Sequence, residues 1–215
     1  MKIEIWSDIA CPWCYVGKRR FEAALTDFPQ RDELQIIWRS FELNPTAPPR
    51  AERPTVELIS AKYGMPVARA QAMMDDMTAT GAADGIAFRF DRSISGNTFD
   101  AHRLLHLAAN RGLREAMVER LFAAYFTDGE AIADRETLAR LGGEVGLDSA
   151  DVRDMLASGA YADDVRADEA RAQQLGITGV PFFAIDEKFG ISGAQSAKVI
   201  TDALMQAFAE REDRS

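Results

Sequence analysis

The sequence predicts an α/β fold that is interrupted by a long, all-helical insertion. Apolar, β-branched strand patterns occur near the two ends of the chain, whereas residues 55–160 have helical spacing almost throughout. The proline-rich stretch Glu42–Pro54 marks a linker at which the pattern changes. We therefore predict an α/β core made of residues 1–44 and 161–215, with residues 45–160 inserted as a helical domain.

The first part of the core is predicted to form a strand, a helix and a second strand. The strands cover residues 2–7 and 34–41, and the helix covers residues 12–27. The helix ends at Phe28 and Pro29, because proline disfavours a helical conformation in the residue before it. A strand, a helix and a strand in this order predict a right-handed βαβ unit with parallel strands.

The last part of the core begins with a helix at residues 161–175, which Gly176 closes. Two short strands, 181–185 and 189–192, follow on either side of a turn. An amphipathic helix at residues 196–210 completes the core. Its inward-facing residues are predicted to be Val199, Ile200, Ala203, Leu204 and Phe208.

The insertion is predicted to consist of helices that glycine and proline signals separate. Met73, Met74 and Met77 lie at helical spacing and are predicted to fill its core. Residues 87–90 are predicted to be extended within a less regular stretch. The helices are predicted to begin at Thr55, Pro66, Asn97, Leu113, Asp134 and Ser149.

The only two cysteines, Cys11 and Cys14, lie where the first strand pattern gives way to the first helix pattern. Pro12 suits the first helical position, because its missing N–H would have no partner there. Unpaired N–H groups and the helix dipole stabilise an anion at Cys11, and a thiolate is the form that attacks a disulfide. Cys14, one turn further on, can then attack a mixed disulfide at Cys11 and release the partner.

Two other interpretations of the cysteines are weaker. A pair of buried structural cysteines does not require this strand–turn–helix context. A zinc site could combine Cys11 and Cys14 with His102 and His106, which share one helix face. However, 87 residues separate Cys14 from His102, and compact zinc units use far shorter gaps. We therefore predict that the protein holds no metal.

Composition argues against several classes of function. The net charge is −9 and no stripe of Lys and Arg stands out, so nucleic acid is not an expected partner. No apolar run reaches membrane-spanning length, so we expect no membrane partner. The first residues already form a strand, which leaves no room for a signal peptide and predicts a cytoplasmic location. In that reducing compartment, a lone cysteine pair is typically redox-active rather than structural.

Local signatures carry a resemblance to a known family. They are Ser7–Gly17 around the cysteines, Gly176–Phe183 near the end, Ser95–Thr98 with Ala101–Leu104 in the insertion, and Ser192–Gln195. With the order of elements, they resemble the thioredoxin fold, and within it the DsbA-like oxidoreductases, over essentially the full length. They are most similar to the FrnE-like branch of predicted dithiol-disulfide isomerases.

The resemblance implies a thiol-disulfide oxidoreductase or isomerase with Cys11 and Cys14 as catalytic residues. It implies a cis Val180–Pro181 bond that faces the cysteines and leaves main-chain groups free to pair with an extended substrate. The alternative interpretation is that Pro181 only begins an edge strand and has no role in the site. No bound cofactor is implied; an external thiol such as glutathione supplies electrons, and the partner is a disulfide-containing protein or a small-molecule thiol. The expected substrate-binding residues are Pro12, Trp13, Asn97, His102, Val180 and Pro181.

Three positions leave alternatives. Related enzymes often have a buried acid six residues before the first cysteine, but Ile5 occupies that position, and Glu4 and Asp8 are out of register. His102 is either a polar residue of a core helix or a modulator of the cysteines. Asn97 is either a helix N-cap alone or a residue of the site.

Two other functions compete with disulfide exchange. The kappa-class glutathione transferases and the 2-hydroxychromene-2-carboxylate isomerases share this fold and insertion, bind glutathione there, and usually have serine at the first motif position. A third interpretation is a non-catalytic binding module or chaperone that uses the groove. The presence of both Cys11 and Cys14 favours redox chemistry. The sequence gives no indication of the oligomeric state.

Overall fold

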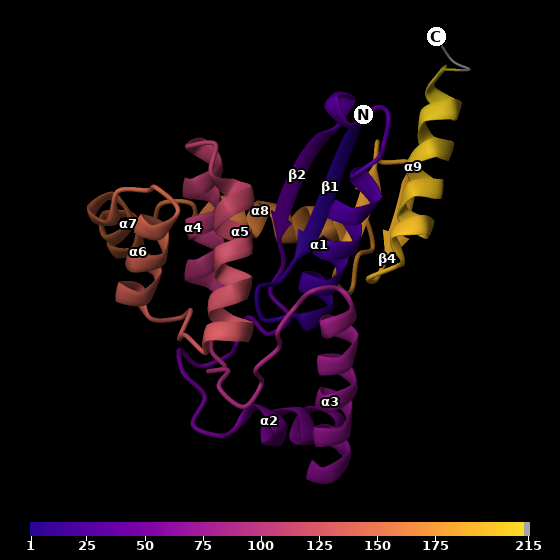
Figure 1. Ribbon diagram of the computed structural model, residues 1–215. Helices are drawn as coiled ribbons and strands as arrows, with labels where there is room; N and C mark the ends of the chain where they lie inside the picture. Colours follow the sequence, from indigo (N-terminus) through magenta and orange to yellow (C-terminus); the bar gives the residue numbers. More distant parts are fainter. Residues whose placement is uncertain (213–215) are drawn as a thin grey trace. The chain divides into compact units, whose positions relative to one another are not determined.

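The computed structural model describes residues 1–212 and confirms the predicted α/β fold with a helical insertion (Figure 1). The chain forms two compact units. The first unit comprises Met1–Leu43 and the chain from Asp168 onward, and the second unit comprises Asn44–Ala167. The second boundary lies inside helix α8 (Ala162–Gln174), a few residues after the division expected from the sequence, because this helix runs unbroken through it.

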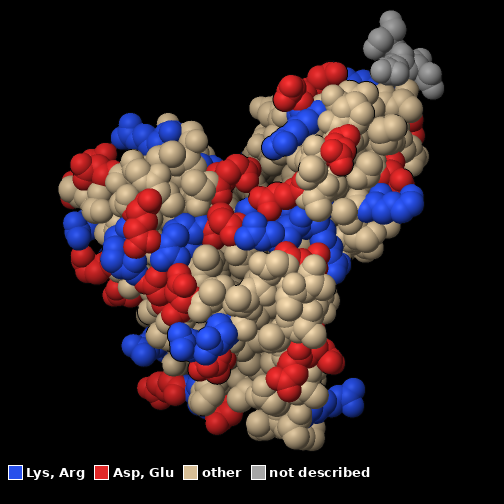
Figure 2. Space-filling model, viewed as in Figure 1, with Lys and Arg blue, Asp and Glu red and all other residues tan. Residues whose placement is uncertain are grey.

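The surface is strongly charged in both signs. On the face shown in Figure 2, Lys and Arg side chains are interspersed with Asp and Glu side chains. Such mixing fits a chain in which 34 acidic residues outnumber 25 basic ones. Within the part of the chain that the structure describes, no helix has both the length and the apolar character that a membrane crossing requires.

A four-stranded mixed sheet forms the centre of the first unit. Its strands are β1 (Lys2–Ser7), β2 (Gln35–Ser40), β3 (Phe182–Ile185) and β4 (Phe189–Ser192), in the order β2-β1-β3-β4. β1 runs parallel to β2 and antiparallel to β3, and β3 pairs with β4 as a hairpin. The predicted βαβ unit and the two returning strands are therefore confirmed. β1 and β3 are the central strands, which explains their nearly continuous burial.

Helices α1 (Pro12–Leu25) and α9 (Ala197–Glu212) cover one face of this sheet (Figure 1). Phe21 of α1 packs on Phe183 of β3, with ring centroids 5.5 Å apart. α9 packs along α1, and a short 3₁₀ turn, η1 (Arg31–Glu33), precedes β2. The apolar side chains of α1 are therefore buried against the sheet and against α9.

The other face of the sheet is covered by the C-terminal part of α8. Trp6 of β1 is fully buried there against Ala172, Ile177 and Ala184. Its indole N–H donates to the main-chain oxygen of Asp168 at 3.0 Å. A buried tryptophan N–H needs such a partner, so this bond orients α8 on β1.

A buried carboxylate, Glu4, lies on the same face as Trp6 and gathers basic residues around it. Glu4 is fully buried, accepts hydrogen bonds from Arg39 at 2.7 Å and Arg171 at 2.8 Å, and pairs with Lys2 at 3.0 Å. Burial raises the pKa of Glu4, but hydrogen bonds from Arg171, Lys2 and Arg39 outweigh burial and lower that pKa to about 2. Glu4 therefore stays charged and ties β1 to β2 and α8.

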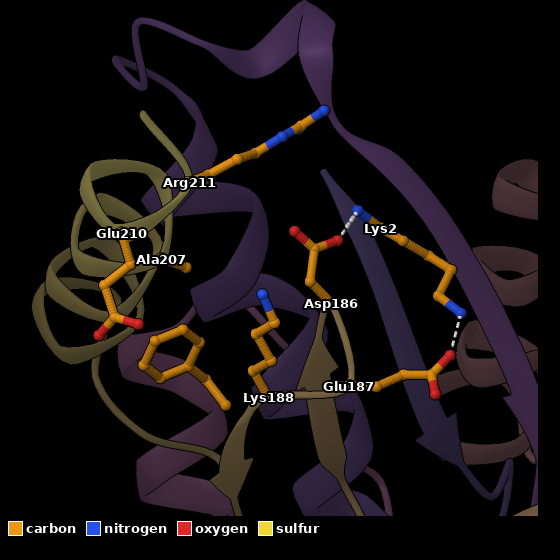
Figure 3. Close-up of a pocket in the computed structure, with 8 residues that line it drawn as sticks. Lys2, Asp186, Glu187, Lys188, Ala207, Glu210 and Arg211 are labelled. Atoms are coloured by element: carbon orange, nitrogen blue, oxygen red, sulfur yellow. Dashed lines mark hydrogen bonds and ion pairs between the residues drawn. The ribbon is translucent and has the colours of Figure 1, made fainter. Parts of the chain in front are cut away.

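The turn between β3 and β4 has two non-glycine residues in the left-handed region, Asp186 (φ 47°) and Glu187 (φ 60°). Both carboxylates bind Lys2: Asp186 accepts its main-chain N–H at 2.7 Å, and Glu187 accepts its ammonium group at 2.7 Å (Figure 3). These bonds hold a conformation that glycine or asparagine usually supplies. The turn borders a polar pocket of about 320 Å³ at the end of β1 away from the cysteines (Figure 3).

The second unit is built from helices and their connections. α4 (Phe99–Asn110) contacts α5, α6 and α7, and α2 pairs with α3. Ala101, Leu104 and Ala108 of α4 are fully buried in this packing. The other elements are α2 (Thr55–Tyr63), α3 (Val67–Ala83), α5 (Arg114–Ala123), the π turn η2 (Ala124–Asp128), α6 (Arg135–Glu144) and α7 (Ser149–Ala157).

Arg103 of α4 organises the end of α7. Its side chain is buried, and its guanidinium donates to the main-chain oxygens of Met155 and Ser158 at 2.6 Å each and of Ala160 at 2.9 Å. It also pairs with Asp100 at 2.6 Å. The last carbonyls of a helix have no partner within the helix, so Arg103 supplies a donor to the oxygens of Ser158 and Ala160 and a further donor to that of Met155, which Ser158 also reaches.

Two sequence predictions about this fold were wrong. Met73 is 42% exposed, because it lies one position off the stripe of α3 that buries Met74 and Met77. Val199 of α9 is 45% exposed and does not face inward. Residues 87–90, predicted to be extended, belong to no strand, and the rings of Phe88 and Phe90 pack on each other and on Phe126 of η2.

Candidate active site

Cys11 and Cys14 lie where β1 gives way to α1, as the sequence predicted. β1 ends at Ser7, and the N–H of Cys11 donates to the oxygen of Asp8 at 3.1 Å, which closes a tight turn. Cys11 is the N-cap residue (φ −97°, ψ 112°) and Pro12 is the first helical residue. The N–H of Cys14 donates to the oxygen of Cys11 at 3.0 Å. The positive end of the α1 dipole is therefore directed at the Cys11 position.

The motif exposes its tryptophan rather than its sulfurs. Trp13 is 46% exposed, whereas Cys11 is 4% and Cys14 is 1% exposed. Both cysteines are free thiols. An exposed indole is a common anchor for binding partners, because it buries a large area at little entropic cost. Trp13 therefore gives the motif an apolar contact surface.

The environment of Cys14 opposes its ionisation. Burial raises the pKa of the Cys14 thiol well above its ordinary value, and the neighbouring Cys11 raises it further. The main chain of Asp8 and the side chain of Ser7 act in the opposite direction but do not cancel the effect of burial. Cys14 is therefore held as a neutral thiol at neutral pH.

The segment before β3 approaches Cys11 from the other end of the chain. The Val180–Pro181 bond is cis, as expected, and the Cys11 thiol donates to the oxygen of Val180 at 3.6 Å. Pro181 is buried, and its ring packs so closely on α1 that a β-carbon at Gly17 would lie 2.8 Å from its Cγ. The structure thus brings Cys11, Val180 and Pro181 together. β3 is a central strand, so the interpretation of Pro181 as the start of an edge strand is wrong.

The loop after β4 completes this arrangement. Gly193 has φ 77°, and its N–H donates to the oxygen of Pro181 at 2.9 Å. Arg20 of α1 donates to the oxygen of Ala194 at 2.7 Å. The Ser192–Gln195 signature therefore links the proline loop to α1. Only glycine adopts that φ without strain, which is the physical reason for its place in the signature.

Asp8 holds the turn that presents the cysteines. It is 1% exposed, and its carboxylate accepts the N–H of Leu43 at 2.7 Å and that of Ala10 at 3.4 Å. Ile5, at the position where related enzymes often have an acid, is fully buried. Asp8 is out of register with that acid, and the sequence signal for its role is a different one: an aspartate two residues before a turn amide typically binds that amide.

The two remaining expected site residues, Asn97 and His102, belong to the second unit. Asn97 precedes α4 by two residues, so Thr98 is the N-cap and the predicted N-cap was one residue early. Its side-chain oxygen nevertheless accepts the N–H of Phe99 at 2.8 Å. His102 is 1% exposed on α4. Their roles in substrate binding stay predictions.

His102 and His106 are the two histidines that a zinc site would need. The ring of His106 stacks on Tyr161 with centroids 6.4 Å apart. Among residues 1–212, no group of three or more His, Cys, Asp or Glu side chains is placed to hold a metal ion. A metal-free protein stays a prediction that elemental analysis can test.

The chain is similar to known proteins in both sequence and fold. The family model of the DSBA-like thioredoxin domain matches residues 2–205. The crystal structure of a probable DsbA oxidoreductase from Streptomyces coelicolor is 51% identical, with a TM-score of 0.94 over 98% of this chain and 91% of that chain. The uncharacterized protein YwbO from Bacillus subtilis is 29% identical over 205 residues, 94% of each chain. The cytosolic disulfide reductase DsbM from Pseudomonas aeruginosa has the same fold, with 21% identity and a TM-score of 0.64 over 100% and 99% of the two chains.

Proposed function

We propose that this chain, which belongs to the family of DSBA-like thioredoxin domains, exchanges thiols and disulfides through Cys11 and Cys14. The family and the 51% identical Streptomyces relative support a disulfide oxidoreductase or isomerase. The family match covers both parts of the core and the insertion together. The FrnE-like branch and the cytoplasmic location stay predictions from the sequence.

In the proposed reaction, the Cys11 thiolate attacks a disulfide RS–SR′. A bond forms between the Cys11 sulfur and RS, and R′S⁻ leaves. The Cys14 thiol then gives up its proton, and its sulfur attacks the Cys11 sulfur, which forms the Cys11–Cys14 disulfide. RS⁻ departs and takes up that proton, so it leaves as RSH. Two electrons pass from the protein dithiol to the substrate disulfide. An external thiol such as glutathione restores the dithiol by the reverse exchanges.

The observation that carries this proposal is the different placement of the two sulfurs. Cys11 is the N-cap of α1, and its thiol reaches the oxygen of Val180 at 3.6 Å. Cys14 is buried one turn further on, and burial raises the pKa of its thiol. Cys14 therefore remains protonated while Cys11 attacks. This order is the one that a nucleophilic and a resolving cysteine require.

The substrate is proposed to lie across the motif and the proline loop. Trp13 offers an exposed ring, and the main chain at Val180 faces the Cys11 sulfur. Once Cys11 is part of a mixed disulfide it has no S–H to donate, so the Val180 oxygen becomes available to a substrate N–H. Pro12 and Pro181 flank this region. A disulfide-containing protein or a small disulfide such as oxidised glutathione fits this proposal.

The direct test is to trap the mixed disulfide. Reduced wild type, Cys11→Ser and Cys14→Ser are mixed with oxidised glutathione, quenched with acid and measured by intact mass spectrometry. We expect a glutathione adduct that accumulates in Cys14→Ser, is absent in Cys11→Ser, and is short-lived in wild type, which ends as the internal disulfide. The reduction potential of the pair against glutathione then decides the net direction in the cell.

The same variants separate disulfide exchange from the competing glutathione-dependent enzymes. A transferase or isomerase binds glutathione without a covalent bond, and the start of α1 can stabilise its thiolate without either cysteine. Full glutathione-dependent turnover in the double variant Cys11→Ser, Cys14→Ser would therefore contradict the proposal. Absence of any adduct in Cys14→Ser would contradict it as well.

A further inference from the structure

Ser7, the last residue of β1, faces the side of the sheet that α1 covers. Side chains alternate along a strand, so Ser7 shares a face with Ile5. Ile5 is paired with Phe183, whose ring lies 5.5 Å from the ring of Phe21 in α1. The face that carries Ser7 is therefore the α1 face, and Ser7 lies at the end of β1 from which the cysteine turn departs.

The hydroxyl of Ser7 is buried and has no hydrogen-bond partner among the described residues. Ser7 as a whole is only 6% exposed. Buried hydroxyls in folded proteins almost always make a hydrogen bond, because losing water without replacing it is unfavourable. A buried hydroxyl without a partner is therefore explained if the protein passes through a state in which this hydroxyl gains a hydrogen-bond partner.

Cys14 is the group next to this hydroxyl that changes state. Although it makes no hydrogen bond to the neutral thiol, Ser7 is close enough to lower the pKa of Cys14 against the effect of burial. The turn and α1 also carry other titratable groups, which are Asp8, Cys11, Tyr15, Lys18, Arg19, Arg20 and Glu22. Lys18 is paired with Glu22, and the Asp8 carboxylate binds the main chain of the turn.

We propose that the Ser7 hydroxyl is a hydrogen-bond donor held for the Cys14 thiolate in the resolving step. The inference rests on the proposed function. When Cys14 attacks the mixed disulfide, its sulfur becomes anionic, a bond forms to the Cys11 sulfur, and the bond from Cys11 to RS breaks. The proton from Cys14 ends on the departing thiolate, which leaves as RSH. Ser7 stabilises the Cys14 sulfur while it carries the charge.

The test uses the full-length reduced protein and the aromatic disulfide 5,5′-dithiobis(2-nitrobenzoate) in a stopped-flow spectrometer. Attack by Cys11 releases one coloured thiolate, and resolution by Cys14 releases the second. We expect Ser7→Ala to leave the first phase unchanged and to slow the second phase about tenfold or more, because a hydrogen bond to a charged group is lost. The pH at which the second phase is half-maximal should rise. Ser7→Thr keeps a hydroxyl and should restore both properties.

Ser40→Ala is the matched control. Ser40 is a buried serine directly opposite Ser7 on β2, and it lies outside the cysteine turn. It should leave both phases at the wild-type rate. Thermal unfolding supplies a second readout: Ser7→Ala removes a hydroxyl without a partner, so its Tm should be unchanged or higher, whereas a structural role for Ser7 would lower it.

The outcomes distinguish this inference from the proposed function. A second phase that is as fast in Ser7→Ala as in wild type overturns the inference, as does an equal slowing in Ser40→Ala. A lower Tm with both phases slowed together also overturns it, because it indicates a structural residue. Release of fewer than two coloured thiolates by wild type contradicts the proposed function itself, whatever Ser7 does.

Discussion

Gly17 and Pro181 lie so close together that no side chain fits between them: a β-carbon at Gly17 would be 2.8 Å from Cγ of Pro181. The first residue belongs to α1, which carries the cysteines, and the second belongs to the loop that faces Cys11. The absence of a side chain at Gly17 therefore sets the distance between the Cys11 sulfur and the loop. Glycine weakens a helix interior, so this contact comes at a cost in helix stability.

Gly17→Ala should displace the proline loop and slow disulfide exchange at Cys11. Overpacking typically costs about 1–3 kcal/mol, and the better helix propensity of alanine returns about 1 kcal/mol, so we expect a net loss of stability of about 2 kcal/mol or less. Activity should fall further than stability, by about tenfold or more, because reacting groups are sensitive to small misplacements. Insulin reduction and urea unfolding measure the two effects.

Gly159→Ala is the control for this substitution. No neighbouring atom lies within 4 Å of a β-carbon built at Gly159. It should change stability by no more than about 0.5 kcal/mol and leave insulin reduction unchanged. Equal activities of Gly17→Ala and wild type would show that the contact with Pro181 does not set the geometry of the site.

The buried Glu4 network should make stability depend on pH. The pKa of Glu4 is lowered to about 2 in the folded protein, below the ordinary glutamate value of about 4.3. The stabilisation is therefore fully present above that ordinary pKa, and it is lost as the pH falls from about 4.5 towards 2. Its size is about 3 kcal/mol at neutral pH. Urea unfolding at a series of pH values measures this loss.

Glu4→Gln should remove this pH dependence and destabilise the protein at pH 7 by about 3–5 kcal/mol, because Arg39 and Arg171 lose their buried partner. Glu136→Gln is the control, since Glu136 forms a surface pair with Arg153 and should contribute less than about 1 kcal/mol. If the acid branch of the stability curve were identical in Glu4→Gln and wild type, another carboxylate would be responsible for it.

Substitution of Arg103 should strongly lower the stability of the second unit. Arg103→Met keeps the length of the side chain but removes the guanidinium that donates to the main-chain oxygens of Met155, Ser158 and Ala160 and pairs with Asp100. We expect a loss of about 3–5 kcal/mol in unfolding free energy. Arg153→Met, at a half-exposed arginine, should cost less than about 1 kcal/mol. A similar small loss in both variants would contradict the assigned role of Arg103.

Substitution of Trp13 should weaken substrate binding rather than lower stability. Because Trp13 is 46% exposed as a residue, Trp13→Ala should change the unfolding free energy by about 1 kcal/mol or less. We expect KM for a peptide disulfide to rise about tenfold, the loss typical of an aromatic anchor, with a smaller change for oxidised glutathione. Tyr63→Ala removes the aromatic ring of an even more exposed residue outside the motif and should leave KM unchanged. Equal KM values for Trp13→Ala and wild type would exclude this anchor.

Local signals account for the parts of this structure that the sequence predicted well. Strand alternation located β1, β2 and the β3–β4 pair, and glycine ended α2 at Tyr63, where Gly64 has φ 62°. The cysteine motif was placed at the start of α1 because Pro12 and the apolar spacing both mark a helix start. These features depend on residues that are close in sequence, so a local pattern contains the information.

The features that the sequence did not reveal depend on distant residues. Glu4 is charged and fully buried because Arg39 and Arg171, from two other elements, surround it. Met73 was placed in the core because helical spacing does not state which side of α3 is covered. The roles of Gly17 and Ser7 appear only when Pro181 and Cys14 are brought next to them. Such pairings are consequences of topology, and a periodicity in one segment does not contain them.

The central position of β1 has a consequence for synthesis on the ribosome. Of the four strands of the sheet, β1 leaves the ribosome first and β2 follows next, so one edge of β1 can pair early. The other edge pairs with residues 182–185, which are made only after the whole helical insertion. Throughout that interval the nascent chain carries an open apolar strand edge, a surface that both chaperones and aggregates recognise. The yield of folded protein therefore depends on how well this edge is protected during translation.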